Sequence, residues 1–442
     1  MSLLLNILLL AAQAGDSATA FVGVATFRTD RPGWDRNQTV VVRGGTIVWV
    51  GPAARARLDP ATRRIAGQGR YLLPGFADMH VHLDREGDLI TYVANGITTV
   101  RNMWGEPRHL EWRRRIAAGE LIGPRIVTAG PILDGNPPSV PQMTVLIDPA
   151  RARAEVDRQA ALGFDFIKVY NSLPKAVFDT VLLAAAAHKL PVAGHVPFEA
   201  GLRGVLASRQ ASIEHLRGYI AELVPATAPV QPGASLKSRS VAWNYVDSTR
   251  MAALAQATAT AGIWNCPTLM VTAELLAPPD RWEELARRPI LQYLGPGAAG
   301  DRATIPYLRD FSPDDYREAG RGVGAQRRMV RELDRAGAGL LLGTDSYLQG
   351  FALEAELAEF EAAGIDRGRI LTIATANAAT FLGESDRWGR IAVGQRADLQ
   401  LLDADPMADL AALDRRAGVM VAGRWLSKAD LAQRLERLRV RP

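Results

Sequence analysis

The fold of this chain is decided by the stretch Leu72-Leu73-Pro74-Gly75-Phe76-Ala77-Asp78-Met79-His80-Val81-His82. It is an apolar run that ends in two histidines spaced two positions apart. Successive side chains of a strand point to opposite faces, so His80 and His82 point the same way. Two imidazoles on one face of a strand end form half of a metal site. The motif alone is too short to be specific. It becomes informative because the rest of the chain supplies residues for the other half of the site.

Short apolar segments alternate with helical ones downstream of this stretch. Such alternation predicts βα units around a parallel sheet. Helical runs are expected at 150–162, 175–188 and near 370–382. Eight strands are expected, at residues 72–82, 97–103, 125–129, 164–170, 191–196, 212–216, 264–271 and 339–345. Eight units of this kind predict an α/β fold, a (β/α)8 TIM barrel over residues 72–388.

Both ends of the chain have the character of β-structure instead. Residues 40–51 predict two strands joined by a tight turn at Gly44-Gly45. Strand-like segments return at 397–402 and 419–425. We therefore expect residues 20–71 and 389–442 to join in one small composite β-sandwich domain beside the barrel.

The composition is that of a soluble globular protein. The chain has 442 residues, 48% of them hydrophobic, and a mean hydropathy of −0.02. Its net charge is +5, and its arginines are scattered among acids rather than gathered in a block, which argues against a nucleic-acid partner. The single cysteine, Cys266, excludes a disulfide within the chain and is expected to be a small buried apolar residue.

The first residues resemble an export signal. Residues 3–12 are apolar apart from Asn6, and Ala12-Gln13-Ala14 matches an A-x-A cleavage site, but no basic residue precedes Arg28. We expect a signal peptide within residues 1–19 and a periplasmic or secreted protein. The alternative is an apolar N-terminal strand in a cytoplasmic protein. The run is too short to span a membrane, so no membrane association is expected.

Polar residues gather at the ends of the predicted strands. Four of the six histidines lie there, and so do a lysine and an aspartate: His80, His82, Lys168, His195, His215 and Asp345. The carboxyl ends of barrel strands converge on one mouth, where catalysis occurs in this fold. A lysine or an aspartate in a buried strand is unfavourable unless it is paired or bound to a metal. Core packing alone does not explain this set.

The residue types indicate a divalent metal. Imidazole and carboxylate ligands suit zinc and related ions. The ammonium group of Lys168 repels a metal, so this residue fits the site only if it is modified. A plain salt-bridging lysine is the alternative.

The whole pattern resembles the amidohydrolase superfamily, close to its imidazolonepropionase-like and prolidase-like branch. The resemblance runs from about residue 40 to 425. It rests on the opening stretch and on four further motifs: Gly96-Ile97-Thr98-Thr99-Val100-Arg101-Asn102, Ile213-Glu214-His215, Gly343-Thr344-Asp345, and Ala376-Asn377-Ala378-Ala379 through Gly394-Gln395-Arg396-Ala397-Asp398-Leu399.

This resemblance implies two divalent metal ions, zinc in the first place. His80, His82 and Asp345 would hold one ion, and His195 and His215 the other. Lys168 would carry a carbamate derived from CO2 that bridges the two. A metal-bound hydroxide would attack a carbonyl group, with Asp345 as the general base and then the general acid. Members of the family are often oligomeric, so a homo-oligomer is expected.

The chain also departs from its relatives. Imidazolonepropionase is mononuclear and lacks the bridging lysine, so Lys168 favours the two-metal branch. Many two-metal relatives have a glycine-rich insertion after the lysine, which is absent from Lys168-Val169-Tyr170-Asn171-Ser172-Leu173. Tyr170 is a candidate donor to the oxyanion of the transition state, and a packing role is the alternative.

Other residues received less specific interpretations. His109 and His188 are expected at the surface, and Trp104 in the core or lining the pocket. Glu214 is expected to face away from His215, in packing or in orienting a ligand. The long segments 217–262 and 272–338 are expected to cover the substrate. Four residues are candidates for binding a substrate carboxylate: Arg281, Arg302, Tyr307 and Arg309.

The sequence as a whole predicts a metal-dependent hydrolase that cleaves an amide, peptide-like or cyclic amide C–N bond of a small-molecule substrate. Two alternatives stay open. One is hydrolysis of a lactone or ester at the same site. The other is a scaffold protein that has kept the fold without catalysis. Nucleic-acid binding is a weaker third reading, because it rests on the isoelectric point of about 9.5 alone.

Overall fold

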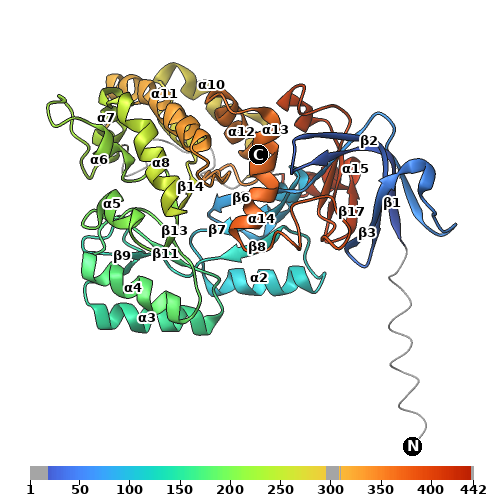
Figure 1. Cartoon of the computed structure of the whole chain (residues 1–442), viewed down its shortest axis with the longest axis horizontal. Helices are drawn as coiled ribbons and strands as arrows, with labels where there is room; N and C mark the ends of the chain where they lie inside the picture. The colour runs from blue at the N-terminus through green and yellow to red at the C-terminus, as the bar shows by residue number, and fades with distance from the viewer. Residues whose placement is uncertain (1–17, 295–307, 309, 440–442) are drawn as a thin grey trace, which may run out of the picture. The chain divides into compact units, whose positions relative to one another are not determined.

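A computed structural model of the chain describes residues 18–294, 308 and 310–439. The chain separates into two compact units (Figure 1). The first unit combines the residues up to Phe76 with Arg367–Gln433. The second consists of Ala77–Asp366 and the residues from Arg434 onward.

The first unit is built on one sheet to which both ends of the chain contribute. Its strands follow the order β17-β16-β15-β5-β1-β2-β3, with β4 also paired to β1. Their bounds are β1 Thr19–Arg28, β2 Gly33–Arg43, β3 Thr46–Pro52, β4 Arg63–Ala66, β5 Tyr71–Pro74, β15 Leu399–Leu402, β16 Arg416–Val421 and β17 Arg424–Ser427. The turn between β2 and β3 is at Gly44 and Gly45, whose positive φ angles of 56° and 77° suit glycine. Leu399 pairs with Pro74, which joins the two ends of the chain.

Short helices complete this unit. They are η1 Ala53–Arg55, α13 Arg367–Thr372, the π-helical turn η9 Ile373–Asn377, α14 Ala378–Phe381, η10 Leu410–Asp414 and α15 Lys428–Glu436. The expected single strand at 72–82 is wrong in one respect. The strand is interrupted at Gly75. As a result β5 belongs to the sheet of the first unit, and β6 (Phe76–Val81) belongs to another sheet.

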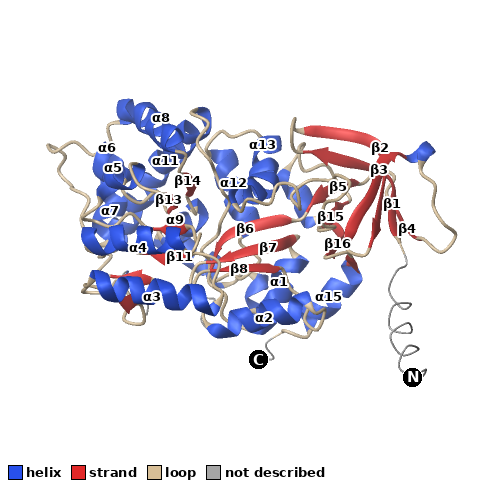
Figure 2. Ribbon diagram, turned by 60° about the horizontal axis from the view of Figure 1, so that its bottom comes forward, coloured by secondary structure: helices blue, strands red, loops and turns tan. Residues whose placement is uncertain are grey.

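The second unit carries two parallel arrays of strands (Figure 2). One has the order β6-β7-β8 and the other the order β10-β9-β11-β12-β13-β14. Their bounds, after β6, are β7 Ile97–Asn102, β8 Arg125–Thr128, β9 Leu133–Asp134, β10 Thr144–Val145, β11 Ile167–Val169, β12 Val192–Gly194, β13 Gln210–Glu214 and β14 Trp264–Cys266. An isolated parallel bridge from Ala129 to Phe166 links the end of β8 to the start of β11. Another, from Asn265 to Leu340, links β14 to the segment 339–345. The amide of Met79 on β6 then donates to Leu342 O at 2.8 Å, so the neighbours follow one another in a closed cycle.

Two expected strands differ from the structure. Residues 339–345 form no regular strand, and two backbone hydrogen bonds join them to each of their neighbours. The strand expected at 264–271 ends at Cys266, because Pro267 has no amide hydrogen and Thr268 adopts a left-handed φ of 47°. The amides of Leu269 and Met270 then begin a helix and donate to the carboxylate of Glu356.

Helices connect the strands of the second unit. Their bounds are η2 Glu86–Asp88, α1 Leu89–Ala94, α2 Pro107–Ala117, α3 Pro149–Leu162, α4 Lys175–Ala187, α5 Gly201–Leu206, α6 Tyr219–Leu223, α7 Leu236–Ala242, η3 Trp243–Tyr245, η4 Ser248–Arg250, α8 Met251–Ala261, α9 Leu269–Leu275, η5 Pro279–Arg281, α10 Trp282–Ala286, η6 Pro289–Tyr293, α11 Pro313–Arg335 and α12 Leu353–Ala362. The helices expected at 150–162 and 175–188 are thus confirmed as α3 and α4. Across the described residues, every helix is too short or too polar to cross a membrane.

Candidate metal centre

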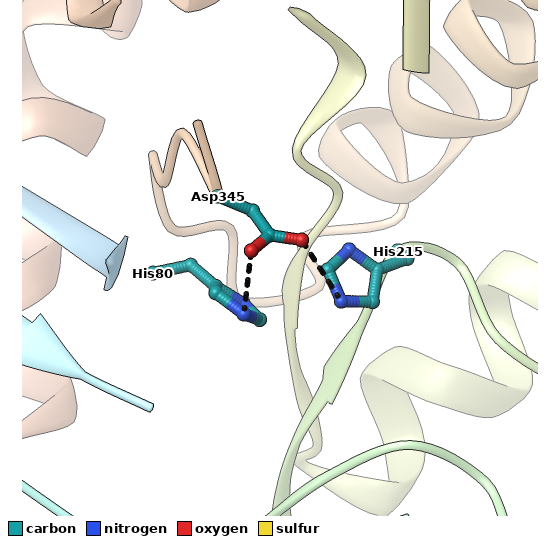
Figure 3. Close-up of side chains that lie close together, drawn as sticks. All are labelled: His80, His215 and Asp345. Carbon is teal, nitrogen blue, oxygen red and sulfur yellow. Dashed lines mark ion pairs between the residues drawn. The ribbon is translucent and has the colours of Figure 1, made fainter. Parts of the chain in front are cut away.

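Three imidazoles converge on one carboxylate in the second unit. His80 Nε2 lies 3.6 Å from Asp345 Oδ1, and His82 Nε2 lies 3.1 Å from the same oxygen. His215 Nε2 lies 3.7 Å from Asp345 Oδ2. Figure 3 shows Asp345 between His80 and His215, with one oxygen directed to each ring. Three nitrogen donors and two oxygens therefore share one small volume.

The backbone places these groups at strand ends. His80 is on β6 and His215 directly follows β13. His215 and Asp345 have positive φ angles of 59° and 48°, which are unfavourable for residues other than glycine. Backbone hydrogen bonds hold both conformations, from His215 N to Cys266 O at 3.0 Å and from Asp345 N to His80 O at 2.7 Å.

Two further predicted residues adjoin this group. The His195 ring, just after β12, lies 4.9 Å from the His215 ring between centroids. Lys168, on β11, is buried and its electrostatic interactions include Asp345. Lys168 Nζ and His195 Nε2 are both buried and have no hydrogen-bond partner among the described residues. Buried polar atoms are rarely left without a partner, so these two nitrogens point to an additional group at the centre.

The electrostatics favour neutral imidazoles. Burial lowers the pKa of His80 to about 4, and burial also holds the pKa values of His195 and His215 well below their usual range. Burial lowers the pKa of Lys168 from 10.5 to about 8. A neutral imidazole has a lone pair to offer, which is the form that binds a metal.

A second layer of residues orients the histidines. Nδ1 of His80 lies 2.8 Å from Glu214 Oε2, Nδ1 of His195 lies 2.8 Å from Asn171 Oδ1, and Nδ1 of His215 lies 2.7 Å from Thr268 Oγ1. In each ring the far nitrogen is fixed, so Nε2 is the atom left for the centre. Sequence reasoning missed Asn171, a polar residue that directly follows the predicted strand 164–170, and Thr268, which lay inside the predicted strand 264–271.

Buried Arg101 fixes Glu214 in turn. Its Nη2 lies 2.9 and 3.0 Å from the two oxygens of Glu214, and its Nη1 donates to Ser212 at 3.0 Å. Burial raises the pKa of Glu214, but Arg101 and the His80 hydrogen bond outweigh that effect and hold it well below its usual range. Glu214 was expected either to pack or to orient a ligand. In the structure it orients a candidate ligand, His80.

A similar support lies under Asp345. Asp78 accepts hydrogen bonds from Thr344 N at 2.9 Å and from Thr344 Oγ1 at 2.7 Å. Burial raises the pKa of Asp78 to about 7. This pair joins the irregular segment 339–345 to β6 and so helps to place Asp345 opposite His80.

Tyr170 stacks on His195. Their ring centroids are 3.7 Å apart and their planes 26° apart. Burial raises the pKa of Tyr170 to about 12, so its hydroxyl group keeps its proton at neutral pH. Trp104 lies beside the centre too, with its ring 6.3 Å from that of His82.

Comparison with known proteins decides the family. The family model described as "Amidohydrolase family" matches residues 71–426, which include all the residues of the centre. This chain belongs to the amidohydrolase family.

Individual relatives of this amidohydrolase agree with that assignment. The imidazolonepropionase of Rubrobacter xylanophilus is 24% identical over 388 residues, which cover 83% of this chain and 84% of the relative. The imidazolonepropionase of Salinispora arenicola is 47% identical, but over 53 residues only, so the chain covers 13% of it.

Solved structures extend the likeness over nearly the whole chain. Bottromycin amidohydrolase is 28% identical with a TM-score of 0.75, covering 97% of this chain and 92% of that protein. A Xaa-Pro dipeptidase with bound methionine has a TM-score of 0.67 at 19% identity, covering 93% of this chain and 100% of the other, and so shares the fold.

Several minor expectations for this amidohydrolase are also settled. His109 is not a surface residue: it is 1% exposed, and its ring accepts from Glu106 N at the start of α2 while contacting Leu83 O at 3.1 Å. His188 is at the exposed end of α4 and contacts Asp157, as expected. Cys266 is buried, as expected.

Of the four candidates for binding a substrate carboxylate, the structure describes Arg281 alone. Arg281 is exposed and pairs with Glu284. Arg302, Tyr307 and Arg309 lie outside the described residues, and so does most of the expected signal peptide.

Proposed function

We propose that this amidohydrolase is a metal-dependent hydrolase that cleaves the C–N bond of a small amide, peptide-like or cyclic amide substrate. The observation that carries the proposal is the convergence of His80, His82 and His215 on Asp345. The buried Lys168 Nζ and His195 Nε2, both without a partner among the described residues, extend it. The names of the imidazolonepropionase relative and of bottromycin amidohydrolase suggest hydrolysis of C–N bonds and so support the proposal.

We infer from the cycle of hydrogen-bonded neighbours that the second unit is a closed (β/α)8 barrel. The site residues then stand at the carboxyl ends of its strands, where the chemistry of this fold is located. The sheet shared by both chain ends is inferred to be the small composite domain.

The donor set fits divalent metal ions, with zinc the first candidate. His80, His82 and Asp345 would hold one ion, and His195 and His215 a second. Lys168, as a carbamate, would contribute oxygen ligands. Burial favours the neutral amine of Lys168, and the neutral amine is the form that combines with CO2. Divalent ions bound here would supply an activated water at neutral pH and polarise the substrate carbonyl.

The chain's own residues then divide the remaining work. Asp345 is placed to accept a proton from the attacking water and to pass it to the leaving nitrogen. The oxygen of water bonds to the carbonyl carbon, the C–N bond breaks, and the nitrogen leaves with the proton. Tyr170, with its hydroxyl group protonated, is a candidate donor to the carbonyl oxygen.

A substrate panel tests this proposal. The zinc-loaded protein is assayed with dipeptides, N-acyl amino acids, cyclic amides, lactones and esters, beside an Asp345→Asn variant. Turnover of one amide class, lost by at least about 1,000-fold in the variant, is expected, because the proton acceptor is removed while the side-chain shape is kept. Turnover of lactones or esters alone would replace the amide proposal with the ester one, and no turnover of any class by a metal-loaded protein would favour the scaffold reading.

A further inference from the structure

Two partly buried arginines adjoin the metal centre and have no carboxylate partner among the described residues. Arg217 is two residues after His215, and Arg239 is on α7, in the segment that follows β13. The Nε atoms of both are buried and have no hydrogen-bond partner among the described residues. Arg217 makes no side-chain hydrogen bond or ion pair with any described residue. Arg239 donates only to the backbone carbonyls of Gly233 and Ala234.

Their charges act on the centre itself. The electrostatic interactions of Arg217 include Tyr170 and Asp345, and its charge also acts on His195 and His215. The charge of Arg239 interacts with Arg217 and Tyr170. Tyr170 in turn stacks on His195. Arg217 therefore lies near the centre and Tyr170, and Arg239 lies near Arg217 and Tyr170.

Arg101 is the contrasting case of a structural arginine in the same chain. It is fully buried, and both oxygens of Glu214, the hydroxyl group of Ser212 and the carbonyl of Met79 accept hydrogen bonds from it. A guanidinium group keeps its charge, and burying a charge without a counter-ion is strongly unfavourable. Two neighbouring arginines without an acidic partner also repel each other. This arrangement is understandable if an anion completes it when substrate binds.

We propose that Arg217 and Arg239 bind a carboxylate group of the substrate, so that the enzyme acts on amides that carry a free carboxylate next to the scissile bond. This inference rests on the proposed function and names its substrate class: N-acyl amino acids and short peptides with a free carboxyl end. A guanidinium group binds a carboxylate through two parallel hydrogen bonds, which gives both affinity and orientation. Divalent ions in the centre would add further positive charge and favour an anionic substrate more strongly.

The first experiment compares matched substrates. A library of N-acetyl amino acids and dipeptides is assayed with the wild type, each beside its C-terminal carboxamide, which has the same shape without the charge. The wild type is expected to prefer the acids. Arg217→Met and Arg239→Met are expected to lose about 100-fold in kcat/KM for the acids, as a buried charge pair loses one partner, and to change little for the amides. Arg158→Met, an exposed arginine of α3 paired with Glu155, is the control for removing a positive charge.

A second pair of substrates shows whether the arginines bind a main-chain or a side-chain carboxylate. N-Acetylaspartate α-amide carries its charge on the side chain and N-acetylalanine on the main chain. Preference for one identifies that carboxylate as the one bound by the arginines. Equal turnover of acids and carboxamides by the wild type overturns the proposal, while leaving the hydrolase function intact.

A binding measurement separates this proposal from catalysis. The same acids and carboxamides are added to the zinc-loaded protein, and the shift in Tm is recorded for the wild type and for Arg217→Met. The acids are expected to raise the Tm of the wild type but not that of the variant, whose metal content stays that of the wild type. If the acids stabilise both proteins equally, the proposal is wrong, whether or not the protein proves to be a hydrolase.

Discussion

Glu214 lies 2.8 Å from Nδ1 of His80, although the two residues are 134 positions apart in the chain. This contact joins β13 to β6 beneath the metal centre. It fixes the ring so that Nε2 faces Asp345, and Arg101 holds the carboxylate in place from the other side. The orientation of the His80 ring therefore depends on Glu214 and, through it, on Arg101.

Changing Glu214 is expected to weaken metal binding. Glu214→Gln keeps the shape and one acceptor, and metal affinity should fall by about 10- to 100-fold. Glu214→Ala should also destabilise the fold by about 3–5 kcal/mol, because the buried charge of Arg101 would lose its carboxylate. Metal titration and denaturant unfolding measure the two effects. Unchanged metal affinity in Glu214→Gln would show that the contact does not orient His80.

The buried amine of Lys168 is expected to lower the stability of the metal-free protein. Its folded-state pKa is about 8 against 10.5 for the unfolded chain, so below pH 8 both states are protonated and the full penalty of about 3 kcal/mol applies. Between pH 8 and 10.5 the folded state loses its proton first, and the penalty shrinks. Metal-free Lys168→Met should therefore be more stable than the wild type at pH 7, by a margin that narrows toward pH 10.5.

Urea unfolding of both proteins at several pH values checks this. Because the same medium is used for both, other titrating groups cancel in the difference. A margin that is constant with pH would mean that Lys168 does not titrate in this range.

His109 is expected to make stability depend on pH on the acid side. Burial lowers its pKa from 6.5 to about 4, so the unfolded chain takes up the proton first as the pH falls. Stability present above pH 6.5 should therefore be lost between 6.5 and 4, by about 3 kcal/mol. His109→Gln still allows an acceptor for Glu106 N, and its stability should be flatter over that range. Parallel losses in both proteins would assign the effect to other groups.

Gly343 is expected to tolerate no side chain. A Cβ atom there would lie 2.4 Å from Cys266 Sγ and 2.7 Å from His80 N, both of which are buried. Gly343→Ala should destabilise the fold by about 2–3 kcal/mol and reduce metal binding, because β6 and the segment before Asp345 must move apart. Gly324→Ala is the matched control. It lies in α11 with open space around it, and should stabilise by about 0.5–1 kcal/mol. Thermal unfolding of both variants measures the contrast.

The sequence predicted the parts of this protein that local pattern determines. The helices α3 and α4, the Gly44-Gly45 turn and the buried Cys266 follow from periodicity, turn chemistry and composition. The seventh strand was extended too far because a continuous apolar run cannot distinguish strand from helix. There the decisive contact is between the amides of Leu269 and Met270 and the distant Glu356.

The candidate site, too, was predicted only where local sequence pattern determines it. Spacing and strand ends singled out six residues: His80, His82, Lys168, His195, His215 and Asp345. The pairing of Glu214 with His80, in contrast, depends on a register between distant strands. Arg217 and Arg239 carried no signal, because the absence of an acid partner is a property of the folded chain. His109 was misplaced for a similar reason, since its partners come from α2 and from the segment after β6.

The metal content per chain is the measurement that tests the account most directly. The wild type and Lys168→Ala are produced with zinc and bicarbonate and analysed by elemental mass spectrometry. The wild type is expected to contain close to two equivalents, and the variant is expected to lose metal. One equivalent in both proteins would contradict the bridging role of Lys168, and no metal in the wild type, even after reconstitution, would contradict the proposed hydrolase.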